Sequence, residues 1–388
     1  MSDVSFIERL LDGVEVEWKS LGTISTLRRG RVMSKGYLAE NAGDYPVYSS
    51  QTANNGMIGK IDTFDFDGEF ISWTTDGANA GTVFYRTGKF SITNVCGLIK
   101  INDESILNYR YLFYWLTIEA QKHVYSGMGN PKLMSHQVEK IPVPIPCPDN
   151  PKKSLEIQAE IVRILDAFTA MTAELTAELT AELNLRKKQY NHYRDQLLSF
   201  EEGEVEWKTL GEVATITIGE FVHKDKQDVN AKYPVYNGGR TATGYYDKYN
   251  NTGNKIIVSA RGANAGFVNR LSSPYWAGNS CYSIGVVNED SLNWNFVYYY
   301  LKQSEAKLIG IQQKGGIPAV SKKQMEEFLL PIPQLSEQER IVAILDKFDA
   351  LTNSISEGLP REIELRQKQY EYYRDLLLSF PKPEEVTA

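Results

Sequence analysis

The sequence repeats itself over almost its whole length, and this duplication limits the folds that the chain can adopt. Three short segments occur twice: Glu-Val-Glu-Trp-Lys at 15–19 and 204–208, Tyr-Pro-Val-Tyr at 45–48 and 233–236, and Gly-Ala-Asn-Ala-Gly at 77–81 and 262–266. The offset between the copies varies over these segments, but from residue 161 onward it stays at 180. A repeat of this length fixes the number of similar units before any fold is assigned. Each copy is therefore a variable block followed by a block of constant length.

Composition sets further limits. A chain of 388 residues, 42% of them hydrophobic, has room for two or three domains with their own cores, and the repeat selects two. A net charge of -7 argues against a wholly basic nucleic-acid coat and leaves only local basic patches to consider. Cys96, Cys147 and Cys281 lie far apart, which suggests neither a disulfide framework nor a zinc site. No stretch approaches the roughly 20 apolar residues of a membrane-spanning helix, so we expect a cytoplasmic protein without a membrane segment.

Each variable block has the pattern of a mixed α/β domain. Short β-branched runs bounded by glycine and asparagine predict strands. An aromatic-rich helix is expected at 109–116 and again at 294–301, with its rings in the core. The proline-containing segments 141–146 and 330–333 cannot continue a helix, and they lead the chain out of each domain in an extended conformation.

The constant blocks have the composition of long helices. Thr-Ala-Glu-Leu occurs three times in tandem from residue 172 to 183, which puts Leu175, Leu179 and Leu183 along one slowly turning face. The second copy has a different sequence here but places Ile355, Leu359 and Ile363 at the same positions. At the start of the second helix, Ser336 followed by Glu339 has the form of a capping box.

These patterns predict an α/β protein with two duplicated mixed α/β domains joined by two long helices. The helices would bury their apolar stripes against each other as an antiparallel coiled coil with pseudo-twofold symmetry. The alternative is that each helix packs only on its own domain. The expected order is a first domain over 1–150, a helical spacer over 151–202, a second domain over 203–335 and a helical spacer over 336–388.

This arrangement resembles the specificity (S) subunit of type I restriction-modification enzymes over essentially the full chain. The resemblance is carried by Ser-Glu-Gln-Glu-Arg-Ile-Val-Ala-Ile-Leu-Asp at 336–346, its partner at 156–166, the proline-containing exits and the tandem Thr-Ala-Glu-Leu units. The resemblance implies two target-recognition domains that each read half of a split site in double-stranded DNA. It also implies helical spacers that set the spacing and hold two adenine methyltransferase (M) subunits, to which two restriction (R) translocase subunits are added.

Signatures of catalysis are missing from the sequence. The Asn-Pro pairs at 130 and 150 are each followed by lysine, so neither forms the motif of an amino methyltransferase. The chain has no phosphate-binding Gly-x4-Gly-Lys-Ser/Thr loop, and its four histidines show no metal-ligand spacing. We therefore expect a non-catalytic chain without a cofactor or metal of its own. S-adenosylmethionine, ATP and Mg are expected on the partner subunits.

Basic and amide side chains in both domains are candidates for DNA contact. Arginine contacts phosphate or reaches guanine O6 and N7 in the major groove, although a solvated loop is the alternative for any basic patch. The two Gly-Ala-Asn-Ala-Gly segments are preceded by Asp76 and Arg261, and their glycines serve either a tight turn or a close approach to DNA. The candidate DNA-binding residues are Arg28, Arg29, Arg31, Lys35, Asp76, Asn79, Lys224, Lys226, Arg240, Arg261, Asn264, Lys314, Lys322 and Lys323.

The ends of the two helical spacers match closely, which suggests that both contact the same kind of partner. The candidate partner-binding residues are Tyr190, Tyr193, Arg194, Tyr370, Tyr373 and Arg374. These matched ends favour a scaffold within a methyltransferase and restriction complex. The competing hypothesis is a stand-alone DNA-binding regulator whose duplicated domains act without enzyme partners.

Overall fold

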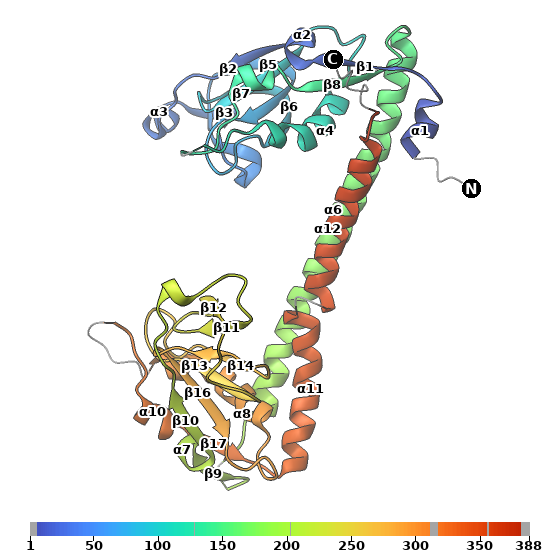
Figure 1. Cartoon of the computed structure of the whole chain (residues 1–388). Coiled ribbons are helices and arrows are strands. Elements are labelled where there is room, and N and C mark those ends of the chain that lie inside the picture. The colour runs from blue at the N-terminus through green and yellow to red at the C-terminus, as the bar shows by residue number, and fades with distance from the viewer. Residues whose placement is uncertain (1–5, 128, 202, 311–316, 355–356, 382–388) are drawn as a thin grey trace. The chain divides into compact units, whose positions relative to one another are not determined.

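The computed structural model describes residues 6–127, 129–201, 203–310, 317–354 and 357–381. The chain divides into two compact units: Met1–Ala177 with Glu364–Ala388, and Glu178–Ile363. Both divisions fall inside the helical spacers and not between a domain and its spacer (Figure 1). Each unit therefore combines one variable block with helical residues from both copies of the repeat.

The first unit is built around a six-stranded sheet with the order β2-β7-β5-β6-β3-β4. The strands are β2 (Ser25–Arg29), β3 (Ala42–Tyr48), β4 (Met57–Ile61), β5 (Phe66–Thr74), β6 (Val83–Ile92) and β7 (Cys96–Ile101). All neighbours pair antiparallel except β3 and β6. Shorter elements surround the sheet: α1 (Phe6–Leu11), α2 (Leu21–Ile24), α3 (Lys35–Glu40), η1 (Ala53–Gly56), η2 (Ala120–His123) and α5 (Ser135–Val138).

The second unit has the same plan, but its sheet is divided in two. A four-stranded sheet contains β10 (Ala214–Ile218), β16 (Cys281–Val286), β13 (Lys255–Ser259) and β14 (Val268–Leu271), and a three-stranded sheet contains β12 (Gly244–Tyr246), β11 (Tyr233–Tyr236) and β15 (Trp276–Ala277). In the first unit the single strand β6 pairs with β5 on one side and with β3 on the other. In the second unit its place is taken by two strands, β14 and β15, which Ser-Ser-Pro-Tyr separates. Pro274 has no N–H for a ladder, which explains the division. The remaining short helices are α7 (Leu210–Val213), η3 (Lys224–Lys226), α9 (Glu305–Gly310) and α10 (Lys322–Glu326).

The aromatic-rich segments form the helices α4 (Tyr109–Glu119) and α8 (Trp294–Gln303). Each is capped by an asparagine, Asn108 or Asn293, whose side chain accepts hydrogen bonds from the first turn. The rings of Tyr111 and Tyr299 are fully buried. The prediction that these aromatics serve the core is confirmed.

The Glu-Trp-Lys motif and the proline-containing exit pair with each other inside each unit. β1 (Val16–Ser20), which contains the first Glu-Trp-Lys, runs antiparallel to β8 (Pro142–Pro146). β9 (Glu206–Thr209) runs antiparallel to β17 (Leu329–Ile332) in the second unit. The proline-containing exits thus form two-stranded ladders with the entry strands, and prolines are tolerated in such edge positions.

The two helical spacers differ in continuity. The first is one helix, α6 (Pro151–Leu197), of 47 residues. The second is divided into α11 (Leu335–Asn353) and α12 (Gly358–Leu377). Gly358 has a φ of +77°, and a Cβ there would lie 2.4 Å from the carbonyl oxygen of Ala350, so only glycine fits this junction. Ile355, which we expected on the apolar stripe, lies outside the described residues.

The predicted capping box at Ser336 is wrong. The N-cap of α11 is Gln334, and Ser336 lies inside the first turn of the helix. The helix begins earlier because the extended strand β17 ends at Ile332 and leaves only a short connection. The start of α11 is instead stabilised by a glutamine further along the helix, described below.

Helices from both copies meet inside each unit, as predicted for an antiparallel pair. In the first unit the ring centre of Phe168 lies 5.8 Å from that of Tyr373, and Thr169 donates a hydrogen bond of 3.1 Å to the Tyr370 hydroxyl. In the second unit Phe348 contacts Tyr190 and Tyr193, with ring centres 6.2 and 5.7 Å apart. Each helix also packs on its own domain, because both clusters around Leu165 and Leu345 belong to domain cores.

The C-terminal end of the second spacer enters the core of the first unit with Leu377, Leu378 and Phe380. There Phe380 contacts Tyr111 and Trp115. Leu198 has the equivalent place in the core of the second unit, and Phe200 contacts Phe296 there. The end of each spacer therefore completes the core of the domain encoded in the other copy.

A buried glutamine fixes each spacer helix to its domain. Gln338 is fully buried; its Nε2 donates to the carbonyl oxygens of Pro333 and Ser291, at 2.7 and 3.1 Å. Its Oε1 accepts from the backbone N–H of Asn293 at 2.8 Å, which holds the residue that caps α8. Gln158 does the same in the first unit, where it accepts from Asn108 at 2.9 Å. Buried polar groups that are satisfied in this way hold two elements in one relative position.

We predict that Gln338→Met lowers the stability of the second unit by about 1 to 3 kcal/mol, because it leaves one N–H and two carbonyl groups buried without partners. Methionine keeps a similar volume, so lost packing contributes little. Urea denaturation followed by circular dichroism measures the change. Gln196→Met, at an exposed position on α6, is the matched control and should leave stability within about 0.5 kcal/mol. Equal stability of both variants would contradict the anchoring role of Gln338.

Candidate nucleic-acid interface

The most similar surface feature of the two units is a glycine turn, Gly77 to Gly81 in the first unit and Gly262 to Gly266 in the second. The four glycines have positive φ angles of 90°, 83°, 92° and 87°, in that order. This conformation favours glycine, so the residues serve a tight turn. A Cβ at Gly77 or Gly262 would meet nothing within 4 Å, so the first glycine of each turn faces open space.

Charged side chains of the first unit gather beside this turn. Arg29 Nη2 donates to the carbonyl oxygen of Asn94 at 2.9 Å and to Thr75 Oγ1 at 3.4 Å. Thr75 donates in turn to Asp76 at 2.6 Å, and Lys132 Nζ lies 3.9 Å from the other Asp76 oxygen. Arg29, Asp76 and Lys132 thus form one polar group at the end of the sheet. The sequence analysis missed Lys132, because a single lysine after Asn-Pro carries no signal without the backbone bridge that joins it to Asp76.

The other predicted residues of the first unit lie around this group. Arg31 is held by Asp65, with Nε 3.0 Å from Oδ2, and by the hydroxyl of Tyr37 at 3.0 Å. The hydrogen bonds that the Arg31 guanidinium donates to Tyr37 and Asp65 raise its pKa above the ordinary value. Arg28 and Lys35 are exposed, and Asn79 is half-buried within the turn.

In the second unit two loops are tied together by an arginine and an asparagine. Arg240 follows the second Tyr-Pro-Val-Tyr and donates from Nε to Asn264 Oδ1 at 3.2 Å, while Asn264 Nδ2 donates to the carbonyl oxygen of Gly238 at 3.2 Å. Arg240 also lies over the ring of Phe267, 5.5 Å from its centre. The predicted residues Arg240 and Asn264 therefore act together.

A cavity of about 860 Å³ opens beside these loops. Its lining includes Arg261, Lys322, Tyr282 and Ser280. Lys323 is exposed next to Lys322 and lies 3.7 Å from Glu327. The cavity thus presents Arg261 and Lys322, of which Lys322 lies 3.3 Å from Glu326, whereas the Tyr282 hydroxyl donates to the carbonyl oxygen of Val320. A negatively charged ligand would fit this lining.

Two predicted lysines of the second unit do not line this cavity. Lys224 and Lys226 are exposed in η3, and the backbone N–H of the nearby Asp228 donates to the carbonyl oxygen of Tyr245 in β12. Lys314 lies outside the described residues.

The two units present opposite charges from the same backbone. Asp76 forms an isolated antiparallel bridge with Lys132, and Arg261 forms the equivalent bridge with Ala319. One unit therefore offers a carboxylate beside an ammonium group, and the other offers a guanidinium beside a methyl group. Surfaces that share a backbone but differ in donors and acceptors are suited to different base sequences.

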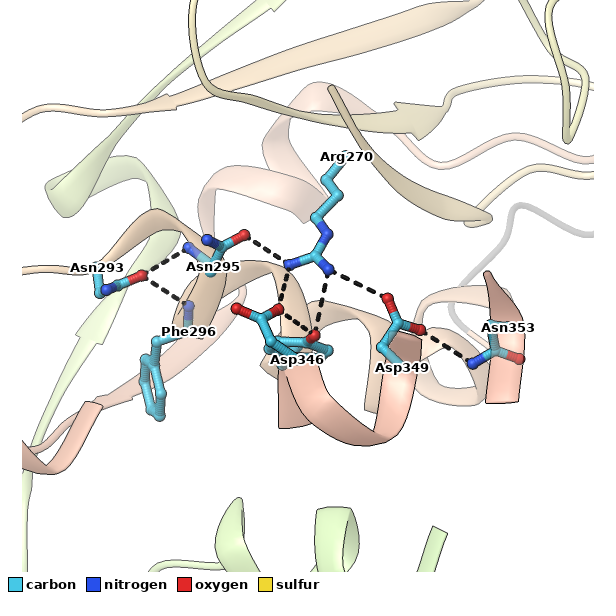
Figure 2. A network of polar contacts seen from close by, with 8 residues as sticks. Arg270, Asn293, Asn295, Phe296, Asp346, Asp349 and Asn353 are labelled. Carbon is cyan, nitrogen blue, oxygen red and sulfur yellow. Dashed lines mark hydrogen bonds and ion pairs between the residues drawn. The ribbon is translucent and has the colours of Figure 1, made fainter. Parts of the chain in front are cut away.

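A second polar network lies where the spacer helix meets the second domain (Figure 2). Arg270 of β14 donates to Asn295 at 2.7 Å, to Asp346 at 3.0 Å and to Asp349 at 3.1 Å. Asp346 also accepts a hydrogen bond of 2.6 Å from Tyr299. Burial and this hydrogen bond raise the pKa of Tyr299, so its hydroxyl stays protonated and donates.

The first unit builds the same junction with an arginine from a different element. Here Arg110 of α4 donates to Asp166, which also accepts from Tyr114. Arg110 occupies the position that Asn295 has in the second copy, and Tyr85 occupies that of Arg270. In both units a guanidinium thus binds the aspartate of Ile-Leu-Asp, and each network fixes a helix to a domain.

The predicted partner-binding residues lie on the helix pairs. Tyr190 is buried at 9% exposure, whereas Tyr193 and Tyr373 expose 44% and 41% of their surfaces. Tyr370 is half-buried against Thr169. Arg194 and Arg374 each form an ion pair of 2.7 Å with the aspartate that follows them. The exposed parts of both tyrosine pairs thus have equivalent surroundings.

The described residues contain no group of three histidine, cysteine, aspartate or glutamate side chains placed to hold a metal ion. Within the same residues no helix is long and apolar enough to cross a membrane.

Comparison with known proteins agrees with this geometry. Residues 13–185 and 202–365 match the family described as the type I restriction modification DNA specificity domain. The chain is 38% identical to the EcoR124I/EcoR124II specificity subunit of Escherichia coli over an alignment 431 positions long, which covers 100% of both proteins.

Two solved structures have a similar fold. One is the S subunit of a type I restriction-modification system from M. genitalium, with a TM-score of 0.53, 17% identity, and coverage of 96% of this chain and 98% of that one. The other is a chain from a study of complex assembly and conformational transition in a type I system, with a TM-score of 0.63, 15% identity, and coverage of 94% and 97%. The duplicated domains, the paired spacers and these matches show that the chain belongs to the family of type I restriction-modification specificity subunits.

Proposed function

We propose that this chain reads an asymmetric, bipartite DNA site, with one half-site for each domain, and positions the M and R subunits of a type I complex. The observation that carries the proposal is the charge inversion on the shared turn. Asp76 with Lys132 and Arg261 with Ala319 stand at equivalent backbone positions. Two such surfaces would select two different sequences, because base edges differ in their patterns of donors and acceptors.

The partners we propose are double-stranded DNA, two M subunits and two R subunits. The matched residues Tyr193 and Tyr373, both partly exposed, support one contact surface for an M subunit on each helix pair. Two copies of the M subunit need two equivalent contact surfaces, and the duplicated spacers would provide them. Tyr190 contributes to this surface indirectly, by packing on Phe348 beneath Tyr193.

The chemistry is proposed to lie on the partners. S-adenosylmethionine would bind the M subunits, and ATP and Mg would bind the R subunits. The part played by this chain is to choose the adenine, by placing each domain in the groove of its half-site. A stand-alone regulator is not favoured, since the family of the chain works within restriction-modification complexes.

Co-expression with a type I methyltransferase (M) subunit from the same organism tests this function. The complex should methylate adenine in one bipartite sequence, and genome-wide mapping of methylated adenines would identify that sequence. The purified chain alone should neither methylate nor cleave DNA. Methyl transfer by the isolated chain, or a continuous target sequence, would contradict the proposal.

We predict that Arg261→Ala changes only the half-site read by the second domain. Loss of a guanidinium contact costs about 1 to 3 kcal/mol of discrimination at one base pair. Mapping of methylated adenines should show a relaxed position in one half-site and an unchanged sequence in the other. Lys347→Ala, at an exposed position on the spacer helix α11, is the control and should keep both half-sites. A change in both half-sites with Arg261→Ala would argue against separate reading.

The tandem Thr-Ala-Glu-Leu units provide a further prediction. Deletion of residues 176–179 removes about 6 Å of helix, at about 1.5 Å per residue. The two half-sites of a bipartite target are separated by a gap of base pairs that neither domain reads. A base pair rises by about 3.4 Å, and only part of the helix length projects along the DNA, so the deletion should shorten this gap by about one base pair.

Four residues rotate the helix by about 40°, so the apolar stripe is kept and the chain should fold. Both half-sites should keep their sequences, because neither domain is changed. Glu178→Gln keeps the helix length and is the control. A gap of unchanged length after the deletion would show that these units do not set the spacing.

A further inference from the structure

One charged side chain of the first unit is buried without the partners that a buried charge requires. Arg86 of β6 is only 2% exposed, and neither Nη1 nor Nη2 has a hydrogen-bond partner among the described residues. Its Nε donates to Ser72 Oγ at 3.0 Å, and it forms no ion pair within the described part of the chain. An unpaired buried charge is costly, so the fold holds this guanidinium at the expense of stability.

Two aromatic rings hold the guanidinium. Its central carbon lies 3.6 Å from the ring centre of Tyr48 and 4.5 Å from that of Phe84. The ring of Tyr48 lies against the guanidinium, while Nη1 and Nη2 have no hydrogen-bond partner among the described residues. Burial lowers the pKa of Arg86 to about 10, which still leaves it charged at neutral pH. Arginine stacked between rings is a rigid, charged fork whose two terminal nitrogens are free for a planar pair of acceptors.

The guanidinium of Arg86 lies beside one short segment, residues 49–56, which joins β3 to β4, includes η1 and is called the covering loop below. Gly56 is placed so closely that a Cβ there would lie 3.0 Å from Arg86 Nη2. Residues 52–55 of the loop are exposed, and Asn54 and Asn55 have φ angles of 49° and 55°. The covering loop contains no large apolar side chain, so its displacement would expose little apolar surface.

The covering loop contacts the segment that lies next to the polar group of Arg29, Asp76 and Lys132. Ser50 donates to the carbonyl oxygen of Val95, and Thr93 donates to Ser49 Oγ at 2.8 Å. The neighbouring carbonyl, that of Asn94, is the acceptor for Arg29. A ligand that binds at Arg29 and Asp76 therefore lies against the same segment that the covering loop contacts.

We propose that Arg86 is a DNA-contacting residue of the first domain, which the covering loop uncovers when DNA binds. This inference rests on the proposed function. The ligand is a pair of acceptors on the DNA that a flat fork binds bidentately, either guanine O6 and N7 or two phosphate oxygens. The second domain lacks the residue, because Leu271 stands at the position of Arg86. The contact would thus be made in one half-site only.

Arg86→Met in the full chain, in complex with the methyltransferase, tests the inference. The probe is a labelled duplex with the bipartite site that the wild-type complex methylates. Binding should weaken about tenfold or more, while the thermal unfolding midpoint should not fall, because the variant removes an unpaired buried charge. Lys89→Met removes one exposed charge from the same strand and is the control; its binding should change by less than about twofold.

Arg86→Lys is the second variant, and it keeps the charge and most of the volume. Lysine cannot make a bidentate contact, so this variant should also bind more weakly than the wild type. A changed base preference in the half-site of the first domain would identify guanine as the acceptor. Equal weakening on all sequences, with both half-sites unchanged, would identify phosphate.

Two results would overturn the inference. One is wild-type binding by Arg86→Lys or Arg86→Met, and the other is a fall in the unfolding midpoint of Arg86→Met in parallel with its binding, since that indicates a structural role. Failure of the proposed function is a separate outcome, because the wild-type complex would then methylate no bipartite site.

Discussion

The structure depends on the burial of one face of each spacer helix against a domain. Ile161 and Leu165 in the first unit, and Ile341 and Leu345 in the second, are fully buried in the domain cores. Apolar contacts of this kind stabilise the packing, but they are not directional. The buried glutamines and the arginine–aspartate ion pairs fix the position of each spacer helix. They link it to α4 in the first unit and to α8 and β14 in the second. The completion of each core by the other copy's spacer makes both copies necessary for either unit.

The two copies of the repeat share the contacts that assemble the units and differ in the side chains at the glycine turns. The junction needs a guanidinium at the aspartate of Ile-Leu-Asp, and Arg110 and Arg270 supply it from different elements. The glycine turns need only their backbone conformation, which leaves Asp76 and Arg261 free to differ. A protein that must keep its assembly surfaces while changing its target would use such a division. Specificity can then change through a few side chains without loss of the scaffold.

Much of the fold could be predicted from the repeat, since two copies of one pattern fix the number of units and the pairing of their helices. The division of the second sheet at Pro274 and the break before Gly358 could not, because both depend on which backbone groups meet in three dimensions. The candidate site was predictable only in part. Arg29 and Asp76 belong to one polar group in the first unit, and Arg240 is hydrogen-bonded to Asn264 in the second. Lys132 and Arg86 carry no local signal, because their places depend on a backbone bridge and on burial.

The central claim is that each domain specifies its own half-site, and a chimaera tests it most directly. In this chain residues 22–138 replace residues 211–325, so that both units carry the polar surface of the first domain while all spacer residues stay unchanged. The boundaries lie next to the paired entry and exit strands, which keeps both ladders. Mapping of methylated adenines for its complex with the methyltransferase should give the half-site of the first domain at both ends of the target. Retention of the original second half-site would contradict the account.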